Sequence, residues 1–274
     1  MDCIKNIIEF ICAAFYLVYL SLLSKKPCRV VIYYHGIKRH DVAGFKRQLK
    51  YLAEKCATVR PSEIKTARAN GDSCVVAITF DDAFVSVIEN AVPILKKHGL
   101  PAGIFVPADN IGKPPRWEIQ DNCSDKNETI MSEEQVSELY NSGFEIFSHT
   151  LSHPVLVESE DDKLKAEMVE SKQILERIIG HEVIGISYPH GACDKRVCAA
   201  AKQAGYKLGF TIEPCTVDDS TDDLQIGRFA VSANDGLVKF RLKVCGAYQV
   251  TKYLQALKRK IMRPNNNGAH RYGI

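Results

Sequence analysis

Two adjacent carboxylates, Asp81 and Asp82, directly follow the apolar run at residues 75–80. A carboxylate is costly to remove from water, so Asp residues beside a buried segment need a partner or a function. At the carboxyl end of a strand such a pair can bind a metal ion or accept a proton. Asp is also a favoured N-cap residue, so a structural cap on the following helix is the alternative.

Two histidines, His149 and His153, lie four residues apart after the apolar run at 144–148. In a helical turn they would share a face and could bind one metal ion, whereas exposed loop histidines are the alternative. Two His and one carboxylate at the same ends of parallel strands form an open three-ligand site for Zn²⁺ or a similar divalent ion. The second carboxylate would then be free to act as a base.

A turn sequence ends another apolar run, where Pro189 and Gly191 flank His190. Pro and Gly at a strand end force a turn that can expose backbone N–H groups. Such N–H groups are the usual material of an oxyanion hole, although an ordinary loop has the same composition.

Seven short apolar runs alternate with helical patterns along the chain. They are rich in β-branched and aromatic residues and continuous rather than alternating, which is typical of parallel strands covered on both faces. They span residues 28–34, 75–80, 102–106, 144–148, 183–188, 208–212 and 226–231. Helices are expected over 87–98, 132–143, 159–180 and 238–260. This alternation predicts an α/β fold with a parallel sheet, but periodicity alone does not separate a closed barrel from an open sheet.

The three motifs T-F-D-D (79–82), S-H-T-L-S-H (148–153) and S-Y-P-H-G (187–191) occur in this order. With them, residues 28–262 resemble the polysaccharide deacetylase family, also called the NodB-homology domain or carbohydrate esterase family 4. The resemblance implies a distorted, incomplete (β/α)7-type barrel with parallel strands. It also implies a metal-dependent hydrolase of non-peptide carbon–nitrogen bonds, which removes an N-acetyl or similar N-acyl group from a sugar in a polysaccharide or lipid-linked glycan.

The resemblance also implies roles for individual residues. Asp82, His149 and His153 would bind one divalent metal ion, with zinc expected and cobalt, nickel or iron as alternatives. Asp81 would be the general base, and a backbone N–H near His190 would help to hold the oxyanion.

The sequence departs from the family pattern in its secondary motifs. Ala83 stands where Gly is common, and Ser187 and His190 replace an Arg and an aromatic residue of the third motif. Neither the D-x-x-D-W motif nor the Leu-x-His motif, which supplies the usual general acid, is found. A non-catalytic carbohydrate-binding relative is therefore the alternative function, although binding alone does not need Asp81. A non-haem iron oxygenase with two His and one carboxylate is a third alternative, but this sequence lacks the β-sandwich-like strand pattern that such an enzyme would need.

Two other residues are candidates for the missing functions. His35, in Y-Y-H-G at the end of the first strand, could protonate the leaving amine, with His190 as its competitor. Arg228 in the last strand could orient Asp81. A histidine in the core and a surface arginine are the structural alternatives.

Composition limits the partners and the compartment. The formal net charge of +3, with a pI near 8.2, is too mild for a nucleic-acid partner, and no basic segment is interleaved with aromatic residues. The ten cysteines are irregularly spaced, which favours free thiols in a reducing compartment over a disulfide framework. Cys193 and Cys198 lie five residues apart without a second pair, so they lack the usual zinc spacing.

The amino-terminal residues form the one targeting-like segment. Residues 7–23 are almost entirely apolar, and Lys25, Lys26 and Arg29 follow them. This length is at the lower limit for a membrane span, and the charges favour a main domain on the cytoplasmic side. A helix packed on the domain or lying on a membrane surface is the alternative. We thus expect an anchor helix at 1–27, the deacetylase domain at 28–262 and a polar tail at 263–274. The oligomeric state is left open.

Overall fold

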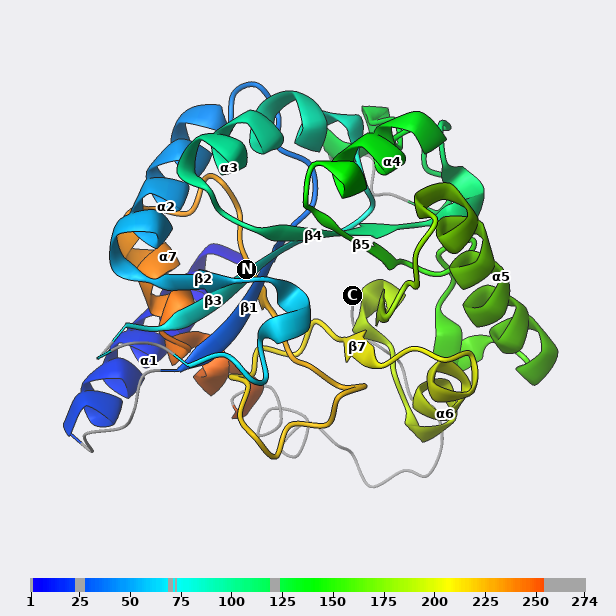
Figure 1. Cartoon of the computed structure of the whole chain (residues 1–274). Helices are drawn as coiled ribbons and strands as arrows, with labels where there is room; N and C mark the ends of the chain where they lie inside the picture. Colours follow the sequence, from blue (N-terminus) through cyan, green and yellow to red (C-terminus); the bar gives the residue numbers. More distant parts are fainter. Residues whose placement is uncertain (1, 23–27, 69–70, 72, 119–123, 254–274) are drawn as a thin grey trace.

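The computed structural model describes residues 2–22, 28–68, 71, 73–118 and 124–253 (Figure 1). The tail expected at 263–274 lies outside these ranges. The central element is a sheet of parallel strands in the order β7-β6-β5-β4-β3-β1-β8, with β2 paired beside β3. The strands are β1 Arg29–Tyr34, β2 Ala57–Val59, β3 Val75–Phe80, β4 Ala102–Val106, β5 Glu145–Ser148, β6 Gly185–Ser187, β7 Leu208–Phe210 and β8 Phe229–Ala230.

Burial on both faces explains why the strand sequences are continuously apolar. In β1, Val30 and Ile32 pack into the outer core beneath the helices, whereas Val31 packs into a second core inside the curl of the sheet. Phe105 of β4 and Phe147 of β5 fill that inner core, with ring centroids 5.3 Å apart. Each strand therefore needs apolar side chains at successive positions, as expected for a barrel-like parallel sheet.

The two edges of the curled sheet are joined by the segment that follows β7. Ile226 forms a parallel bridge with Phe210, and three residues later Phe229 pairs with Ile32 of β1. The sheet is thus a distorted barrel that one short segment completes, which confirms the predicted fold class.

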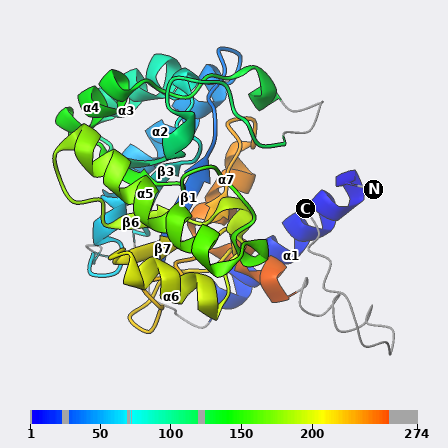
Figure 2. The same cartoon turned by 90° about the vertical axis from the view of Figure 1, so that its right-hand side faces the viewer.

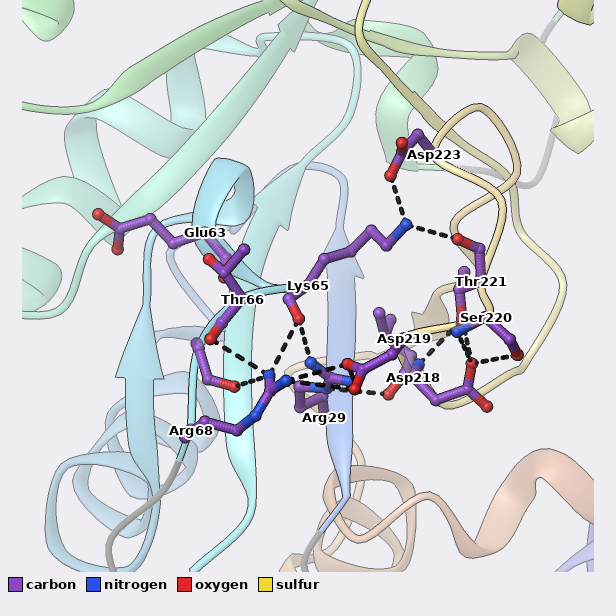
Figure 3. A network of polar contacts seen from close by, with 12 residues as sticks. Arg29, Glu63, Lys65, Thr66, Arg68, Asp218, Asp219, Ser220, Thr221 and Asp223 are labelled. Carbon is purple, nitrogen blue, oxygen red and sulfur yellow. Dashed lines mark hydrogen bonds and ion pairs between the residues drawn. The ribbon is translucent and has the colours of Figure 1, made fainter.

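The loop that leads to this closing segment is held by ion pairs at the amino-terminal end of the sheet (Figure 3). Asp219 accepts from Arg29 at 2.7 Å and from Arg68 at 3.1 Å, and Asp223 pairs with Lys65 at 2.5 Å. Because the acidic partners are largely exposed, these contacts contribute modestly to stability and mainly fix the course of the loop.

Helices cover the outer face of the sheet (Figure 1). They are α2 Val42–Lys55, α3 Val92–His98, α4 Glu133–Asn141, α5 Asp161–Ile179, α6 Lys195–Gln203 and α7 Leu237–Val244. The capping box at α4 is confirmed, because Ser132 and Gln135 exchange side-chain-to-backbone hydrogen bonds. Gly99 ends α3 and Gly180 ends α5 in the left-handed conformation.

Three predictions of secondary structure need correction. The helix expected at 87–98 begins as a π-helix, Val87–Ala91, because Pro93 has no N–H for the regular bonding pattern. The helix expected at 238–260 is interrupted after Val244, since Gly246 adopts φ 73° and a short 3₁₀ turn follows. Residues 250–253 are helical again, and residues 254–260 lie outside the described ranges. Strand β2 was not predicted, because three residues are too few to show a period.

Helix α1, Asp2–Leu22, lies beside α7, and its amino-terminal end extends away from the barrel (Figure 2). Ala13 is fully buried against the domain, whereas Ile8, Ile11 and Phe15 are exposed. No helix in the described ranges is long and apolar enough to cross a membrane. The membrane-spanning form of the predicted anchor is therefore not supported, and the helix packed on the domain is the form observed.

Candidate active site

The catalytic candidates lie together at the carboxyl edge of the sheet. The backbone hydrogen bonds between neighbouring strands extend to Asp81 and to His149. The Asp81 N–H donates to the Tyr34 carbonyl at 2.9 Å, which extends the pairing of β3 with β1. The His149 N–H donates to the Val106 carbonyl at 2.9 Å, which extends the pairing of β5 with β4. Both motifs thus leave the sheet at the edge where α/β folds build their sites.

Asp82, His149 and His153 form one buried cluster. The Asp82 Oδ1 atom lies 3.5 Å from His149 Nε2 and 3.6 Å from His153 Nε2. One ligand atom from each residue lies within 4.8 Å of the others, so a single ion could contact all three. A helical turn between the histidines was considered from the sequence, but the observed turn is not helical. Thr150 and His153 have φ values of 66° and 63°. The two imidazoles converge through this left-handed turn instead.

The chemistry of these donors fits a divalent cation. Within the described part of the chain, Asp82 Oδ1 is buried without a hydrogen-bond partner, a costly state that a bound cation would relieve. Burial lowers the pKa of His149 to about 4 and that of His153 well below its ordinary value, so both imidazoles are neutral. His149 Nδ1–H donates a hydrogen bond to the carbonyl oxygen of Ser187 at 2.8 Å, which leaves Nε2 free to act as the ligand. Burial also raises the pKa of Asp82 to about 7.

Left-handed backbone conformations are concentrated around this cluster. Asp82, Ala83, Thr150, His153 and His190 have φ values between 51° and 67°. Such conformations cost about 1–3 kcal/mol for residues other than Gly, and they are typical of functional sites. Ala83 has a φ of 51°, a conformation that Gly adopts without steric cost, which explains why Gly is common at this position. In this chain, Ala adopts the same conformation.

Asp81 is held by a buried arginine that comes from the closing segment. Arg228 donates from Nη1 to Asp81 Oδ1 at 2.7 Å and from Nη2 to Oδ2 at 2.9 Å. Burial would raise the pKa of Asp81, but the guanidinium outweighs it, so the pKa is lowered and the carboxylate stays ionised. The structural alternative of a surface arginine is wrong, because Arg228 is 0% exposed.

The same arginine accounts for the altered third motif. Arg228 Nη2 also donates to Ser187 Oγ at 2.7 Å, at the position where the family often has an Arg. The small Ser187 side chain leaves room for the guanidinium, which packs over the rings of Tyr33 and Phe105 at 4.6 and 5.0 Å. The positive charge beside Asp81 thus comes from the closing segment, immediately before β8.

Two more histidines lie at the same rim. His35 follows β1, its side chain is exposed, and its positive charge would lower the pKa of Asp82. The His190 ring centroid lies 5.0 Å from that of His153. Partial burial lowers the pKa of His190, so this imidazole carries a proton near neutral pH less readily than an ordinary histidine does.

Two residues at the site were not among the sequence predictions. Trp117 stacks on the His153 ring, with centroids 4.2 Å apart. Glu167 of α5 is buried and accepts from the N–H groups of Leu151 and Ser152, both at 2.9 Å, so it holds the turn between the two histidine ligands. Its signal in the sequence is a carboxylate on the buried, mainly apolar face of α5.

Relatives of known sequence are similar to this chain over most of its length. The YxkH protein of Bacillus subtilis is 29% identical over 202 residues, which cover 70% of this chain and 67% of that protein. The poly-β-1,6-N-acetyl-D-glucosamine N-deacetylase of Staphylococcus aureus is 26% identical over 210 residues, covering 72% of this chain and 69% of that enzyme.

Solved structures share the fold. The Streptococcus pyogenes deacetylase PplD, determined with acetate, has a TM-score of 0.66 at 23% identity and covers 81% of this chain and 99% of its own. IcaB from Ammonifex degensii also has a TM-score of 0.66 at 23% identity, with coverage of 82% and 98%. A sequence model of the polysaccharide deacetylase family matches residues 68–209, slightly more than half of the chain, and includes both the Asp and the His motifs. The chain therefore belongs to the polysaccharide deacetylase family, whose members are metal-dependent hydrolases that remove N-acetyl groups from sugars.

Proposed function

We propose that this protein holds Zn²⁺ at Asp82, His149 and His153 and hydrolyses the N-acetyl groups of an amino-sugar polysaccharide. The observation that carries the proposal is the buried, unpartnered Asp82 oxygen facing two neutral imidazoles. Zinc in hydrolases favours three ligands of this kind with one position left open. A bound ion would polarise an acyl carbonyl and make water a better nucleophile near neutral pH.

Asp81 is the group that takes a proton from the attacking water. Its two oxygens accept from Arg228, and each retains capacity for a further hydrogen bond. The lowered pKa keeps Asp81 ionised, and the bidentate contact holds it in one orientation. This arrangement supports the enzyme over a non-catalytic relative, because a binding site alone does not need an oriented base.

The leaving amine needs a proton when the carbon–nitrogen bond breaks. We assign this role to His35, which directly follows β1 at the carboxyl edge of the sheet and is exposed to solvent. Arg228 is too basic to give up a proton and orients Asp81 only. The N–H groups of the turn around His190 are the proposed donors to the oxyanion. Water addition then yields a carboxylic acid and a free amino sugar.

The Staphylococcus aureus relative supports a substrate class. That enzyme is named as acting on poly-β-1,6-N-acetyl-D-glucosamine, and its similarity extends over 72% of this chain. We therefore propose a polymer of N-acetylated glucosamine, with the β-1,6-linked form as the first substrate to assay.

Helix α1 supports an additional proposal about location. Its exposed apolar residues, Ile7, Ile8, Ile11 and Phe15, lie opposite the face that contacts the domain. An amphipathic helix of this kind can lie in a membrane surface without crossing it. We propose such contact with the membrane on its cytoplasmic side, where anionic lipids would attract the Lys and Arg residues that follow the helix.

The test measures metal content and acetate release on the full chain. After treatment with a chelator, addition of Zn²⁺ should restore acetate release from poly-β-1,6-N-acetylglucosamine, with Co²⁺, Ni²⁺ and Fe²⁺ assayed in parallel. Asp82→Asn should lose the metal, whereas Asp81→Asn should keep it and lose about 10²–10⁴-fold in turnover. Equal loss of metal in both variants would show that the two roles are misassigned. Metal binding without acetate release from any N-acetylated polymer would favour the non-catalytic relative.

A further inference from the structure

A pair of thiols lies at the start of α6, just beyond the active-site turn Pro189–Gly191. The Sγ atoms of Cys193 and Cys198 are 2.8 Å apart, and both side chains are partly buried. A disulfide bond is about 2.05 Å long, so the two sulfurs need to approach by only about 0.8 Å. No part of the deacetylation chemistry uses either thiol.

Local structure explains why the two side chains meet. Asp194 is the N-cap of α6, and its Oδ1 accepts from the Val197 N–H at 2.8 Å. Cys193 therefore precedes the cap and Cys198 is the fourth helical residue, the two positions whose side chains pack together in a hydrophobic staple. The Cys198 N–H donates to the Asp194 carbonyl at 3.0 Å, which fixes this first turn. The capped helix holds the two sulfurs beside each other.

The thiol pair is also close to the active-site turn along the chain. Only Ala192 separates Cys193 from Gly191, and the Gly191 N–H donates back to the Tyr188 carbonyl at 2.9 Å. His190 and Gly191 have φ values of 58° and 66°, so this turn occupies the left-handed region. A covalent bond from Cys193 to the helix would restrict the segment that exposes the proposed oxyanion donors.

We propose that Cys193 and Cys198 form a reversible disulfide, a covalent staple that joins the active-site turn to α6. The oxidant is a low-molecular-weight disulfide such as oxidised glutathione. One thiolate displaces a reagent thiol to form a mixed disulfide, and the second cysteine displaces the other. Each cysteine gives up one proton and one electron, one S–S bond forms between them, and the reagent leaves as two thiols. Burial and the neighbouring sulfur raise the pKa of Cys193, so exchange should accelerate as pH rises.

The first experiment locates the bond in the full-length protein. Samples are equilibrated in glutathione buffers from reduced to oxidised, free thiols are alkylated, and tryptic peptides are identified by mass spectrometry. Lys195 and Arg196 lie between the two cysteines, so the disulfide should link the separate peptides 178–195 and 197–202. A reductant should release both peptides. Alkylation of both cysteines in oxidised buffer, or a separate glutathione adduct on each, would contradict the proposal. The two side chains would then only pack against each other, without forming a disulfide.

Matched variants test the specificity and the effect on the turn. Cys198→Ser should abolish the cross-link, whereas Cys28→Ser should retain it. The latter alters a second thiol pair, in which the Cys28 and Cys74 sulfurs are 3.3 Å apart. In the oxidised parent, amide hydrogen exchange over 189–193 should slow and Tm should rise by about 2–4 °C. Neither change should occur in Cys198→Ser. A cross-link at Cys28–Cys74 alone would overturn the proposal. Unchanged amide hydrogen exchange over 189–193 in the cross-linked parent would also overturn it.

Discussion

Replacing Arg228 with Met tests whether a buried charge holds the proposed base. Arg228 is 0% exposed and donates to both Asp81 oxygens at 2.7 and 2.9 Å. Met retains much of the side-chain volume but leaves the Asp81 carboxylate buried without its counter-charge. Breaking a buried ion pair in this way costs about 3–5 kcal/mol. At about 2–4 °C per kcal/mol for a chain of this size, Tm should fall by roughly 6–20 °C.

The pH dependence of this loss has a definite sign. In the parent, the lowered pKa of Asp81 stabilises the fold above the ordinary Asp value near 3.9, and this stabilisation is lost as pH falls through the folded-state pKa. Without Arg228, burial raises the pKa of Asp81. The stability difference between parent and variant should therefore be largest near neutral pH and shrink towards pH 4. Chemical denaturation at several pH values measures it directly.

Activity should respond in the same direction. The acidic limb of the pH–rate profile should move to higher pH in Arg228→Met, because Asp81 then binds its proton more tightly. Loss of orientation should lower turnover by about 10²-fold at neutral pH. Arg241→Met is the matched control, since Arg241 is an exposed arginine of α7 packed over Tyr51. An acidic limb that stays in place, with a fall in Tm no larger than that of the control, would refute the reasoning.

Three further outcomes are expected. In His35→Ala, acetate release should lose the high-pH limb of its pH–rate profile, while His190→Ala should keep it; the reverse pattern would transfer the role of acid to His190. Glu167→Gln should lower zinc affinity by about 10–100-fold in a competition titration with a chelator, because the histidine-bearing turn loses its anionic acceptor. The exposed Glu170→Gln on the same helix should not change zinc affinity, and equal losses would show only a general effect on α5. Deletion of residues 1–24 should lower Tm, since Ala13 is buried against the domain; an unchanged Tm would mean that α1 acts as an anchor only.

The strands were largely predictable from the sequence, and their burial explains why. The expected runs 75–80 and 102–106 coincide with β3 and β4, because every position of these two strands is buried and all but Thr79 are non-polar. The run expected at 226–231 was less accurate, since only Phe229–Ala230 pairs with β1 while Ile226 bridges to β7. This segment pairs with β7 at one edge of the sheet and with β1 at the other. Its sequence therefore does not show the apolar pattern of one continuous strand.

The sequence by itself determined which chemical groups the site contains and on which edge they lie. Asp81, Asp82 and His149 follow apolar runs, and the carboxyl ends of parallel strands share one edge of a sheet. The order of the three motifs indicated the family, and the family resemblance in turn implied metal-dependent hydrolysis. These inferences hold because each depends on neighbours within a few residues along the chain.

Only the tertiary structure decided how those groups are paired and aimed. Arg228 meets Asp81 across 147 residues of sequence, and its contact with Ser187 explains a motif that looked degraded. The histidine ligands converge through left-handed residues and a carboxylate from α5 rather than through a helical turn. Sequence periodicity reports which face of an element is buried. It carries no information about which distant side chain will supply the counter-charge, because that choice is made only when the curled sheet brings its two edges together.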